Sequence, residues 1–299
     1  MRNRSALRNS AEAVLARALV GILGNAPRPL ADSIGQGCAR LLDTFAPRLR
    51  NTAYRNLELA YPAESDAWRQ ITVDGVYRSI GRLLVAFAKL PRIDRSNVGE
   101  WIRYEGLEHY AAAKARGKGV LFATGHLGNW ELSAFAHALL TEKMSIVVRP
   151  LDNPLLDDLV ETRRALSGNQ LLSKRDFARA ILQALKDNEP VGILVDQNSA
   201  GDNAAFVPFF GKLACANLTF AKLAARSGAA VIPGFAVWSE QERRYVLRFY
   251  PEVEMAGDAV EDTARIQRSV ETAIREYPDQ WLWIHRRWKT RPAGEPDLY

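Results

Sequence analysis

The sequence predicts an α/β protein with a mixed, largely parallel sheet flanked by helices and preceded by a helical segment. Up to about residue 92, apolar residues recur at helical spacing, and beyond it short apolar runs alternate with amphipathic stretches. Such alternation is typical of a parallel sheet whose faces are covered by helices. We therefore expect a helical, membrane-associating segment over 1–92 and an α/β core over 93–299.

The first helix is expected near the N-terminus, around Arg17. Glu12 and Arg17 interrupt its apolar run, which falls short of the roughly 18 uncharged residues of a membrane-spanning helix. No clear signal-peptide cleavage site follows. The pattern fits a helix lying in the membrane surface, and equally a helix packed on the rest of the protein. Its apolar positions are Val14, Leu15, Ala18, Leu19, Ile22 and Leu23.

Two more apolar stripes at helical spacing precede residue 92. One begins after Pro29, and the other ends at Pro91, because proline cannot continue a helix. The first stripe comprises Leu30, Ile34, Cys38, Leu41, Leu42 and Phe45, and the second comprises Ile71, Val76, Ile80, Leu83, Leu84 and Phe87.

The α/β core is predicted from short apolar runs and the amphipathic stretches between them. The runs expected to form strands are 119–125, 144–150, 191–197, 229–238 and 244–250. The stretches expected to form helices are 130–143, 174–187, 217–228 and 262–277.

Composition narrows the class of protein. The 299 residues are 47% hydrophobic and 25% charged, which excludes general disorder. Two distant cysteines, Cys38 and Cys215, provide no disulfide framework and fit a reducing compartment. The net charge of +6, mostly from arginine, fits a basic soluble surface or an anionic partner. Because no nucleic-acid-binding module is recognisable, a nucleic acid is not the expected partner.

The stretch "ATGHLGNWE" (123–131) is the strongest candidate for chemistry. His126 follows a predicted strand, where ligand sites form in open α/β sheets, and Asn129 can cap the helix that follows. Glu131, in the first turn of that helix, can hold one imidazole nitrogen and leave the other basic, as a general base requires. Alternatively, Glu131 complements the helix dipole and His126 merely fills the turn.

Other chemistry finds no support in the sequence. His137 and Glu142 repeat the His-to-Glu spacing, but His137 lies in the middle of a predicted helix and is expected to pack in the core. The sequence contains no G-x-S-x-G elbow, H-E-x-x-H motif, P-loop or G-x-G-x-x-G fingerprint. Four scattered histidines and two cysteines predict no metal site. A histidine base would then act on a hydroxyl group that the substrate brings.

Five blocks in order give the sequence a family resemblance: "GHLGNWE", "VVRPLDNPLLDDLVETRRALSG", "ILVDQN", "FVPFFG" and "PDQWLWIHRRWKTRP". They resemble the late acyltransferases of bacterial lipid A biosynthesis, within the lysophospholipid acyltransferase superfamily. The likeness extends from "NLELAYP" (56–62) nearly to the C-terminus. The H-x4-E/D motif of this family falls on His126 and Glu131. An apolar N-terminal anchor longer than the one here is common among such proteins.

The resemblance implies transfer of a fatty acyl chain from acyl carrier protein to a hydroxyl of a phosphorylated glycolipid, without a cofactor. His126 would remove the hydroxyl proton and Glu131 would orient the imidazole. Arg149 and Arg164 match arginines of the second block and suit a substrate phosphate or a developing oxyanion. Their alternative is an ion pair with a nearby aspartate, Asp152, Asp157 or Asp158. Asp196, at the end of a strand, is expected to contact His126 or the substrate, or to cap the next turn.

The resemblance also implies a place in the cell, on the cytoplasmic face of the bacterial inner membrane, with peripheral attachment or a single N-terminal anchor. The net positive charge would serve anionic lipid or the acidic carrier protein. The same chemistry on a phosphatidylinositol mannoside, an ornithine lipid or a lysophospholipid stays open. So does a non-catalytic, basic membrane-binding protein.

Two aromatic stretches allow more than one interpretation. "FVPFFG" (206–211) fits a loop that receives the acyl chain, or a short core strand. Trp281, Trp283 and Trp288, close to Arg286 and Arg287, fit either a lipid headgroup boundary or the inside of the protein.

Overall fold

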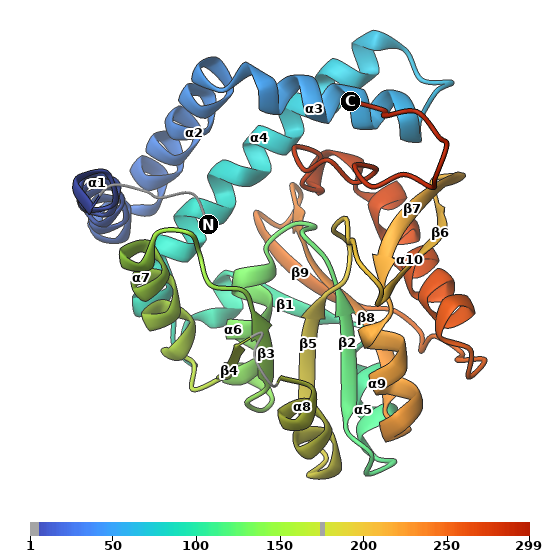
Figure 1. Ribbon diagram of the computed structural model, residues 1–299. Helices are drawn as coiled ribbons and strands as arrows, with labels where there is room; N and C mark the ends of the chain where they lie inside the picture. The colour runs from blue at the N-terminus through green and yellow to red at the C-terminus, as the bar shows by residue number, and fades with distance from the viewer. Residues whose placement is uncertain (1–5, 174–176) are drawn as a thin grey trace.

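A seven-stranded sheet forms the centre of the molecule (Figure 1). The computed structural model describes residues 6–173 and 177–299. The strand order is β1-β9-β8-β2-β5-β3-β4; only the β8–β9 pairing is antiparallel in this sheet. β6 and β7 form a separate antiparallel pair. The predicted α/β class, with a mixed, largely parallel sheet flanked by helices, is confirmed.

The elements have the following bounds. The strands are β1 Ile102–Glu105, β2 Val120–Thr124, β3 Ser145–Val148, β4 Gln170–Ser173, β5 Pro190–Leu194, β6 Ala204–Phe209, β7 Lys212–Asn217, β8 Ala230–Ser239 and β9 Arg244–Phe249. The helices are α1 Ala6–Asn25, α2 Arg28–Phe45, α3 Pro47–Ala60, α4 Asp66–Lys89, α5 Leu107–Lys114, α6 Trp130–Leu140, α7 Pro154–Ala165, α8 Phe177–Lys186, α9 Thr219–Ser227 and α10 Ala259–Glu276.

The five predicted strands correspond to β2, β3, β5, β8 and β9, and the four predicted helices to α6, α8, α9 and α10. The first three residues of the helix predicted over 174–187 lie outside the described residues. β1, β4 and β7 were not predicted, because each is short and half-exposed or contains polar residues that weaken its pattern; β6 corresponds to the core-strand alternative given for 206–211. Helices cover both faces of the sheet: α8, α9 and α10 lie on one face, and α5 and α6 on the other (Figure 1).

Helices α1 to α3 gather around α4, which is the longest of the described helices. α2 crosses α4 where two glycines meet. A Cβ atom on Gly35 would lie 2.9 Å from the carbonyl oxygen of Gly81, so the helices approach more closely than side chains would allow. The face of α2 that packs is therefore made of small residues, Ala31, Gly35 and Ala39. Much of the apolar stripe predicted for α2 is instead exposed, including 81% of Phe45.

α1 has features of both expected kinds of helix, one packed on the protein and one exposing an apolar face. Val20 and Leu23 are buried, whereas Val14, Leu15 and Ile22 are more than half exposed. The helix therefore packs on the protein with one face and presents another, apolar face to its surroundings. No helix within the described residues has the length and hydropathy needed to cross a bilayer.

The tryptophans of the C-terminal stretch lie inside the protein. Trp281, Trp283 and Trp288 are at most 1% exposed, so the interpretation that placed them at a headgroup boundary is wrong. They pack with Phe209 and Phe210 of the "FVPFFG" stretch, which is a core strand and turn. Tyr61 and Leu57 join the same core, so residues of the helical segment and of the α/β core share it.

Candidate active site

The pairing of β2 with β5 brings His126 and Asp196 together. The two strands are parallel, and Thr124 is the register partner of Leu194. Both chains continue past the strand ends, so the residues two positions later, His126 and Asp196, meet at the carboxyl edge of the sheet. His126 Nδ1 lies 2.9 Å from Asp196 Oδ1. The sequence placed both residues at this edge, and the register makes them neighbours.

Glycines allow the close approach. A Cβ atom on Gly125 would lie 3.0 Å from the carboxylate carbon of Asp196. Gly128 has φ +65°, and a Cβ there would lie 2.0 Å from the carbonyl oxygen of Ala236, so only glycine fits. Asn129 then caps α6, its side-chain oxygen accepting from the backbone N–H of Leu132. Close backbone contacts at the two glycines and the cap at Asn129 therefore fix the conformation of the turn that contains His126.

Asp196 is buried and accepts three hydrogen bonds. The backbone N–H of His126 and the indole N–H of Trp281 each donate to Oδ2 at 2.7 Å. Because an ionised carboxylate only accepts, Nδ1 of His126 carries the proton of the third bond. The other ring nitrogen, Nε2, is left with its lone pair, and its neighbour is the side-chain amide of Gln197 at 3.4 Å.

The environment adjusts both pKa values. Burial opposes the imidazolium, but the charge and hydrogen bond of Asp196, with the charge of Glu131, outweigh it and raise the pKa of His126 above 6.5. Burial would also raise the pKa of Asp196; the imidazolium, the His126 backbone N–H and Trp281 outweigh it and lower that pKa. The pair therefore holds its proton on the imidazole, beside a carboxylate that stays ionised.

Glu131 is placed differently from the expectation. Its carboxylate accepts two hydrogen bonds from Arg164 of α7, with distances of 2.8 Å from Nε and 2.6 Å from Nη2. This fork-to-fork geometry is the strong form of an ion pair. The expectation that Glu131 holds an imidazole nitrogen is corrected: Asp196 occupies Nδ1, because the helix turn directs Glu131 towards α7. Glu131 acts on His126 through its charge.

Arg149 follows β3 and is exposed at the mouth of the site. Of the aspartates that could have paired with it, Asp157 accepts from the backbone N–H of Leu151, and Asp158 pairs with Arg17. Within the described part of the chain, the Arg149 guanidinium makes no hydrogen bond or ion pair. It is therefore available to an anionic ligand.

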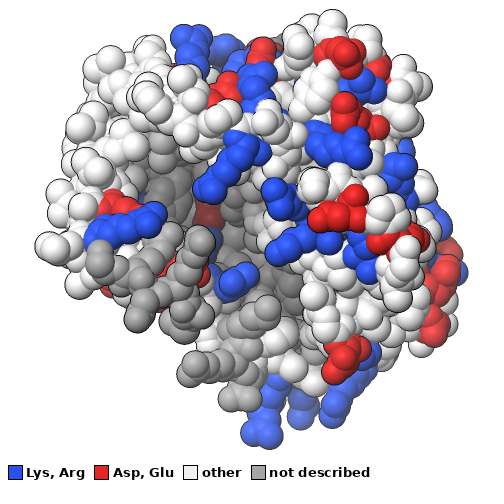
Figure 2. Space-filling view, turned by 45° about the horizontal axis from the view of Figure 1, so that its top comes forward, with Lys and Arg blue, Asp and Glu red and all other residues white. Residues whose placement is uncertain are grey.

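A cavity of about 780 Å³ opens beside His126. Polar side chains, including Glu131, Arg149 and Arg164, line it near the carboxyl edge of the sheet. Further along the strands its wall is apolar and includes Phe122, Ile146, Leu194, Leu247 and Phe249. Register partners Phe122 and Gly192 lie on the same face, beneath α6. Figure 2 shows a hollow in the molecular surface with Lys and Arg side chains along its rim.

His137 lies in the same cavity wall but is buried among aromatic rings, as expected for a packed core histidine. Its Nδ1 is 2.9 Å from the Tyr104 hydroxyl, and its ring makes edge contacts with Tyr110 and Phe122. Burial lowers the pKa of His137 to about 4. This histidine is therefore neutral at physiological pH and lacks the carboxylate partner that His126 has.

Sequence reasoning missed one member of the site, Trp281, which is far along the chain. Its indole N–H anchors Asp196, and an isolated bridge between Leu127 and Trp281 ties the two segments together. The backbone of Leu282 donates to the His126 carbonyl at 2.9 Å. The only signal available was the block "PDQWLWIHRRWKTRP", which marks the segment without giving its contact.

Comparisons with known proteins agree on one family. The family model described as bacterial lipid A biosynthesis acyltransferase matches residues 3–290. The lipid A biosynthesis palmitoleoyltransferase of Escherichia coli (strain K12) is 32% identical over 276 residues, which cover 91% of this chain and 89% of the relative. The lauroyltransferase of the same organism is 30% identical over 276 residues (91% and 90%). Its myristoyltransferase is 25% identical over 264 residues (86% and 82%).

Proposed function

Because the chain belongs to the bacterial lipid A biosynthesis acyltransferase family, and is therefore an acyltransferase, we propose that it acylates a hydroxyl of a phosphorylated lipid A precursor. The acyl donor in this proposal is the thioester of acyl carrier protein. One observation supports the proposal: the side chain of His126, which Asp196 holds by a hydrogen bond, lines a cavity whose deeper wall is apolar. A base at the mouth of an apolar cavity suits an acyl chain whose carbonyl end must meet an alcohol.

The proposed reaction begins with the acceptor hydroxyl at Nε2 of His126. The imidazole takes the hydroxyl proton as the oxygen attacks the thioester carbonyl carbon. Asp196, held ionised by its three donors, stabilises the resulting imidazolium and fixes its orientation. When the tetrahedral intermediate collapses, the carbon–sulfur bond breaks, the new ester remains, and the imidazolium returns its proton to the leaving thiolate.

Glu131 and Arg164 take a positioning role in this scheme. The fork-to-fork pair keeps the guanidinium of Arg164 beside the mouth of the cavity. There its charge can stabilise a developing oxyanion or contact the acceptor. Arg149, which is exposed at the same mouth, suits a phosphate group of the acceptor because a guanidinium presents two parallel donors to phosphate oxygens.

Peripheral attachment to the cytoplasmic face of the inner membrane completes the proposal. α1 and α2 expose Leu7, Leu15, Leu41 and Phe45, each by more than half. Large apolar residues at such exposure are unfavourable in water and suit the interfacial region of a bilayer. The net charge of +6 favours both an anionic membrane and an acidic carrier protein.

The test uses the purified full chain, an acyl carrier protein thioester and a lipid A precursor, with mass spectrometry of the lipid product. The expected result is a mass gain of one acyl chain, and a loss of roughly 10²- to 10⁴-fold in rate in His126→Ala. His109→Ala is the matched control, because His109 does not line the cavity. A His126→Ala protein with wild-type rate contradicts the assigned base. Acylation of a lysophospholipid or ornithine lipid in place of the precursor contradicts the acceptor.

A further inference from the structure

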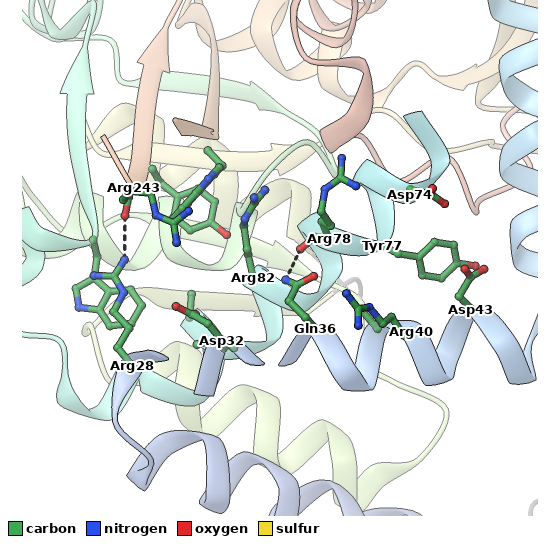
Figure 3. Close-up of a pocket in the computed structure, with 16 residues that line it drawn as sticks. Arg28, Asp32, Gln36, Arg40, Asp43, Asp74, Tyr77, Arg78, Arg82 and Arg243 are labelled. Carbon is green, nitrogen blue, oxygen red and sulfur yellow. Dashed lines mark hydrogen bonds between the residues drawn. The ribbon is translucent and has the colours of Figure 1, made fainter. Parts of the chain in front are cut away.

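A second cavity of about 550 Å³ lies between α2, α4 and the turn that joins β8 to β9 (Figure 3). Within the described residues it shares no lining residue with the cavity of His126. Its floor is formed by buried side chains of α2 and α4, among them Ala39, Val85 and Ala86. It is therefore a separate site, to which the reaction described above assigns nothing.

Polar side chains from the two helices face each other across this cavity (Figure 3). Residues four positions apart share one face of a helix, and both helices use this spacing. The stripe on α2 is Arg28, Asp32, Gln36 and Arg40, and the stripe on α4 is Asp74, Arg78 and Arg82. The close crossing at Gly35 and Gly81 fixes how the two stripes oppose each other. The Gln36 side chain bridges them by donating to the Arg78 carbonyl at 3.1 Å.

The cavity has an excess of positive charge. Arg243, from the β8–β9 turn, brings the number of arginines in its lining to five, against three aspartates. Two of those aspartates share one further guanidinium group, that of Arg50, which does not line the cavity. Arg50 forms a two-pronged pair with Asp43 at 2.8 Å and also reaches Asp74 at 2.5 Å. Counting Arg50 and also Glu240, which pairs with Arg82, six guanidinium groups face four carboxylates, so positive charge stays in excess.

Three of the five arginines are held by aromatic rings and local acceptors. Arg28 stacks on Trp101, 4.4 Å from the ring centroid, and donates to the Arg243 carbonyl at 3.1 Å. Arg82 lies 4.8 Å from the Trp238 ring centroid and pairs with Glu240. The third, Arg243, lies 5.9 Å from the same centroid and 3.7 Å from Glu240. These contacts order the guanidinium groups of Arg28 and Arg82 in advance of any ligand.

The other two arginines are unengaged. Within the part of the chain that the structure describes, neither the Arg40 nor the Arg78 guanidinium makes a hydrogen bond, ion pair or ring contact. They come from opposite helices and line the same cavity (Figure 3). A ligand that accepts from both would bridge α2 and α4, and would meet the pre-ordered arginines beyond them.

We propose that this cavity binds a phosphate ester group, at a site separate from the acceptor hydroxyl at His126. Phosphate is the class that several convergent guanidinium groups fit best, because its oxygens accept paired N–H donors from different directions and its charge can exceed one. The guanidinium groups in its wall fit a charged headgroup better than an acyl chain, and its volume of about 550 Å³ is large enough for a headgroup.

The position of the cavity favours a phosphate carried by a lipid. The opposite flank of α2 exposes Leu30, Leu41 and Phe45, the surface that the proposed membrane attachment uses. This part of the inference rests on the proposed function. A headgroup drawn from the membrane beside α2 would reach the polar flank of the same helix, and would anchor the helical segment while the acceptor occupies the other cavity.

The test measures binding of the full chain to inorganic phosphate, to glucosamine 6-phosphate, and to digalactosyldiacylglycerol vesicles, which contain no phosphate, with and without added phosphatidylglycerol. The His126→Ala background keeps catalysis out of the readout. Arg40→Gln/Arg78→Gln removes two charges without breaking a contact, and is expected to weaken phosphate-dependent binding at least about tenfold. Asp32→Asn is expected to strengthen it roughly threefold, because a like charge is removed.

The matched control is Arg226→Gln/Arg268→Gln, which removes two exposed arginines from α9 and α10 on the other side of the molecule. It is expected to keep binding within about twofold of the parent protein. Vesicles whose charge comes from a fatty acid separate phosphate recognition from charge attraction, and should bind the Arg40→Gln/Arg78→Gln protein as well as the parent.

The arms also identify the source of the phosphate. A selective loss with the soluble esters supports a free phosphate ester, and a selective loss with phosphatidylglycerol vesicles supports a lipid headgroup. Equal losses in the control variant, equal losses with fatty-acid vesicles, or no phosphate-dependent binding at all would each overturn the proposal. Failure of acyl transfer in the wild-type protein would instead count against the proposed function, since binding is measured without turnover.

Discussion

His126 and His137 line one cavity, and each is followed five positions later by a glutamate, yet their surroundings differ in kind. In neither case does that glutamate hold its histidine. Glu131 is taken by Arg164, and Glu142 accepts from the Tyr110 hydroxyl at 2.6 Å and from Lys114 at 2.5 Å. The two environments differ because Asp196 contacts His126, whereas no carboxylate within the described residues contacts the ring of His137.

The difference appears directly in the pKa values. Asp196 and Glu131 raise the pKa of His126 despite its burial, whereas burial among rings lowers the pKa of His137 to about 4. A base that must hold a proton during reaction needs the first environment, and a neutral core side chain needs the second. Spacing along the chain therefore identifies candidates, and the partner supplied by another strand distinguishes them.

The largest effect is expected when Asp196, the partner that distinguishes His126 from His137, is replaced. Asp196→Asn leaves the imidazolium of His126 without its counter-charge, and kcat should fall by about 10³-fold or more. Because the folded pKa of His126 is raised, the acidic limb of kcat/KM in the wild type should have its midpoint above pH 6.5. In Asp196→Asn burial dominates, so that midpoint should move to lower pH.

The measurement is the pH profile of acyl transfer, with Glu142→Gln as control. An unchanged acidic limb in Asp196→Asn would show that the two groups are not coupled.

For His137 we expect substitution to change the pH dependence of protein stability and not the rate of acyl transfer. The pKa of His137 in the folded protein, about 4, lies below the ordinary 6.5. Between these two pH values the histidine is therefore protonated in the unfolded chain and neutral in the folded protein. The free energy of unfolding therefore has its full value above pH 6.5, and it decreases by about 3 kcal/mol as the pH falls towards 4. Denaturant unfolding of His137→Gln across this range should show a correspondingly smaller loss. His109→Gln should follow the wild type; a slope shared by all three proteins would contradict the assignment.

The pair of Glu131 and Arg164 should behave as one unit. Glu131→Gln and Arg164→Gln should each lower kcat/KM about 30-fold, which is a loss of about 2 kcal/mol of transition-state stabilisation, because each leaves a partly buried charge without its partner. The double variant should lose little more than either single variant. Steady-state kinetics in a double-mutant cycle measure the coupling, and additive losses would show that the two side chains act separately.

The smallest expected effect concerns the apolar end of the cavity, near His137. A Cβ on Gly192 would lie 2.7 Å from Cε of Met144, so a side chain there takes space from the cavity. Gly192→Val should shift preference towards shorter acyl donors by about 0.8 kcal/mol, or about fourfold, for each methylene displaced. Competition between donors of different length, read by product mass, tests this. Gly37→Ala, which adds a methyl to open space, should leave the preference unchanged.

The sequence predicted more of the sheet than of the site. Strands such as β2 and β8 are buried, continuous apolar runs, and their pattern depends only on local residues. The contact between His126 and Asp196 depends on which strands are neighbours, and α6, β3, α7, β4 and α8 lie between β2 and β5 in the sequence. Glu131 illustrates the limit, because its position on the helix is predictable while its partner, Arg164, comes from a separate helix.

The exposed stripe of α2 shows a second limit. Periodicity located the apolar residues Leu41 and Phe45 correctly on one side of a helix, but could not tell that small residues would form the packed side. The glycine crossing with α4 decides this, because close helix contact favours residues without bulk.

The register of β2 against β5 has a consequence for how such a protein can change. Because the ladder of main-chain hydrogen bonds aligns His126 with Asp196, the intervening loops can lengthen, shorten or exchange their contents while these two side chains stay in contact. A slip of one residue in β5 would instead turn Asp196 to the opposite face of the sheet. Under the proposed function, changes in the connections would alter the substrate preference, whereas the strands keep the proposed base and its carboxylate together.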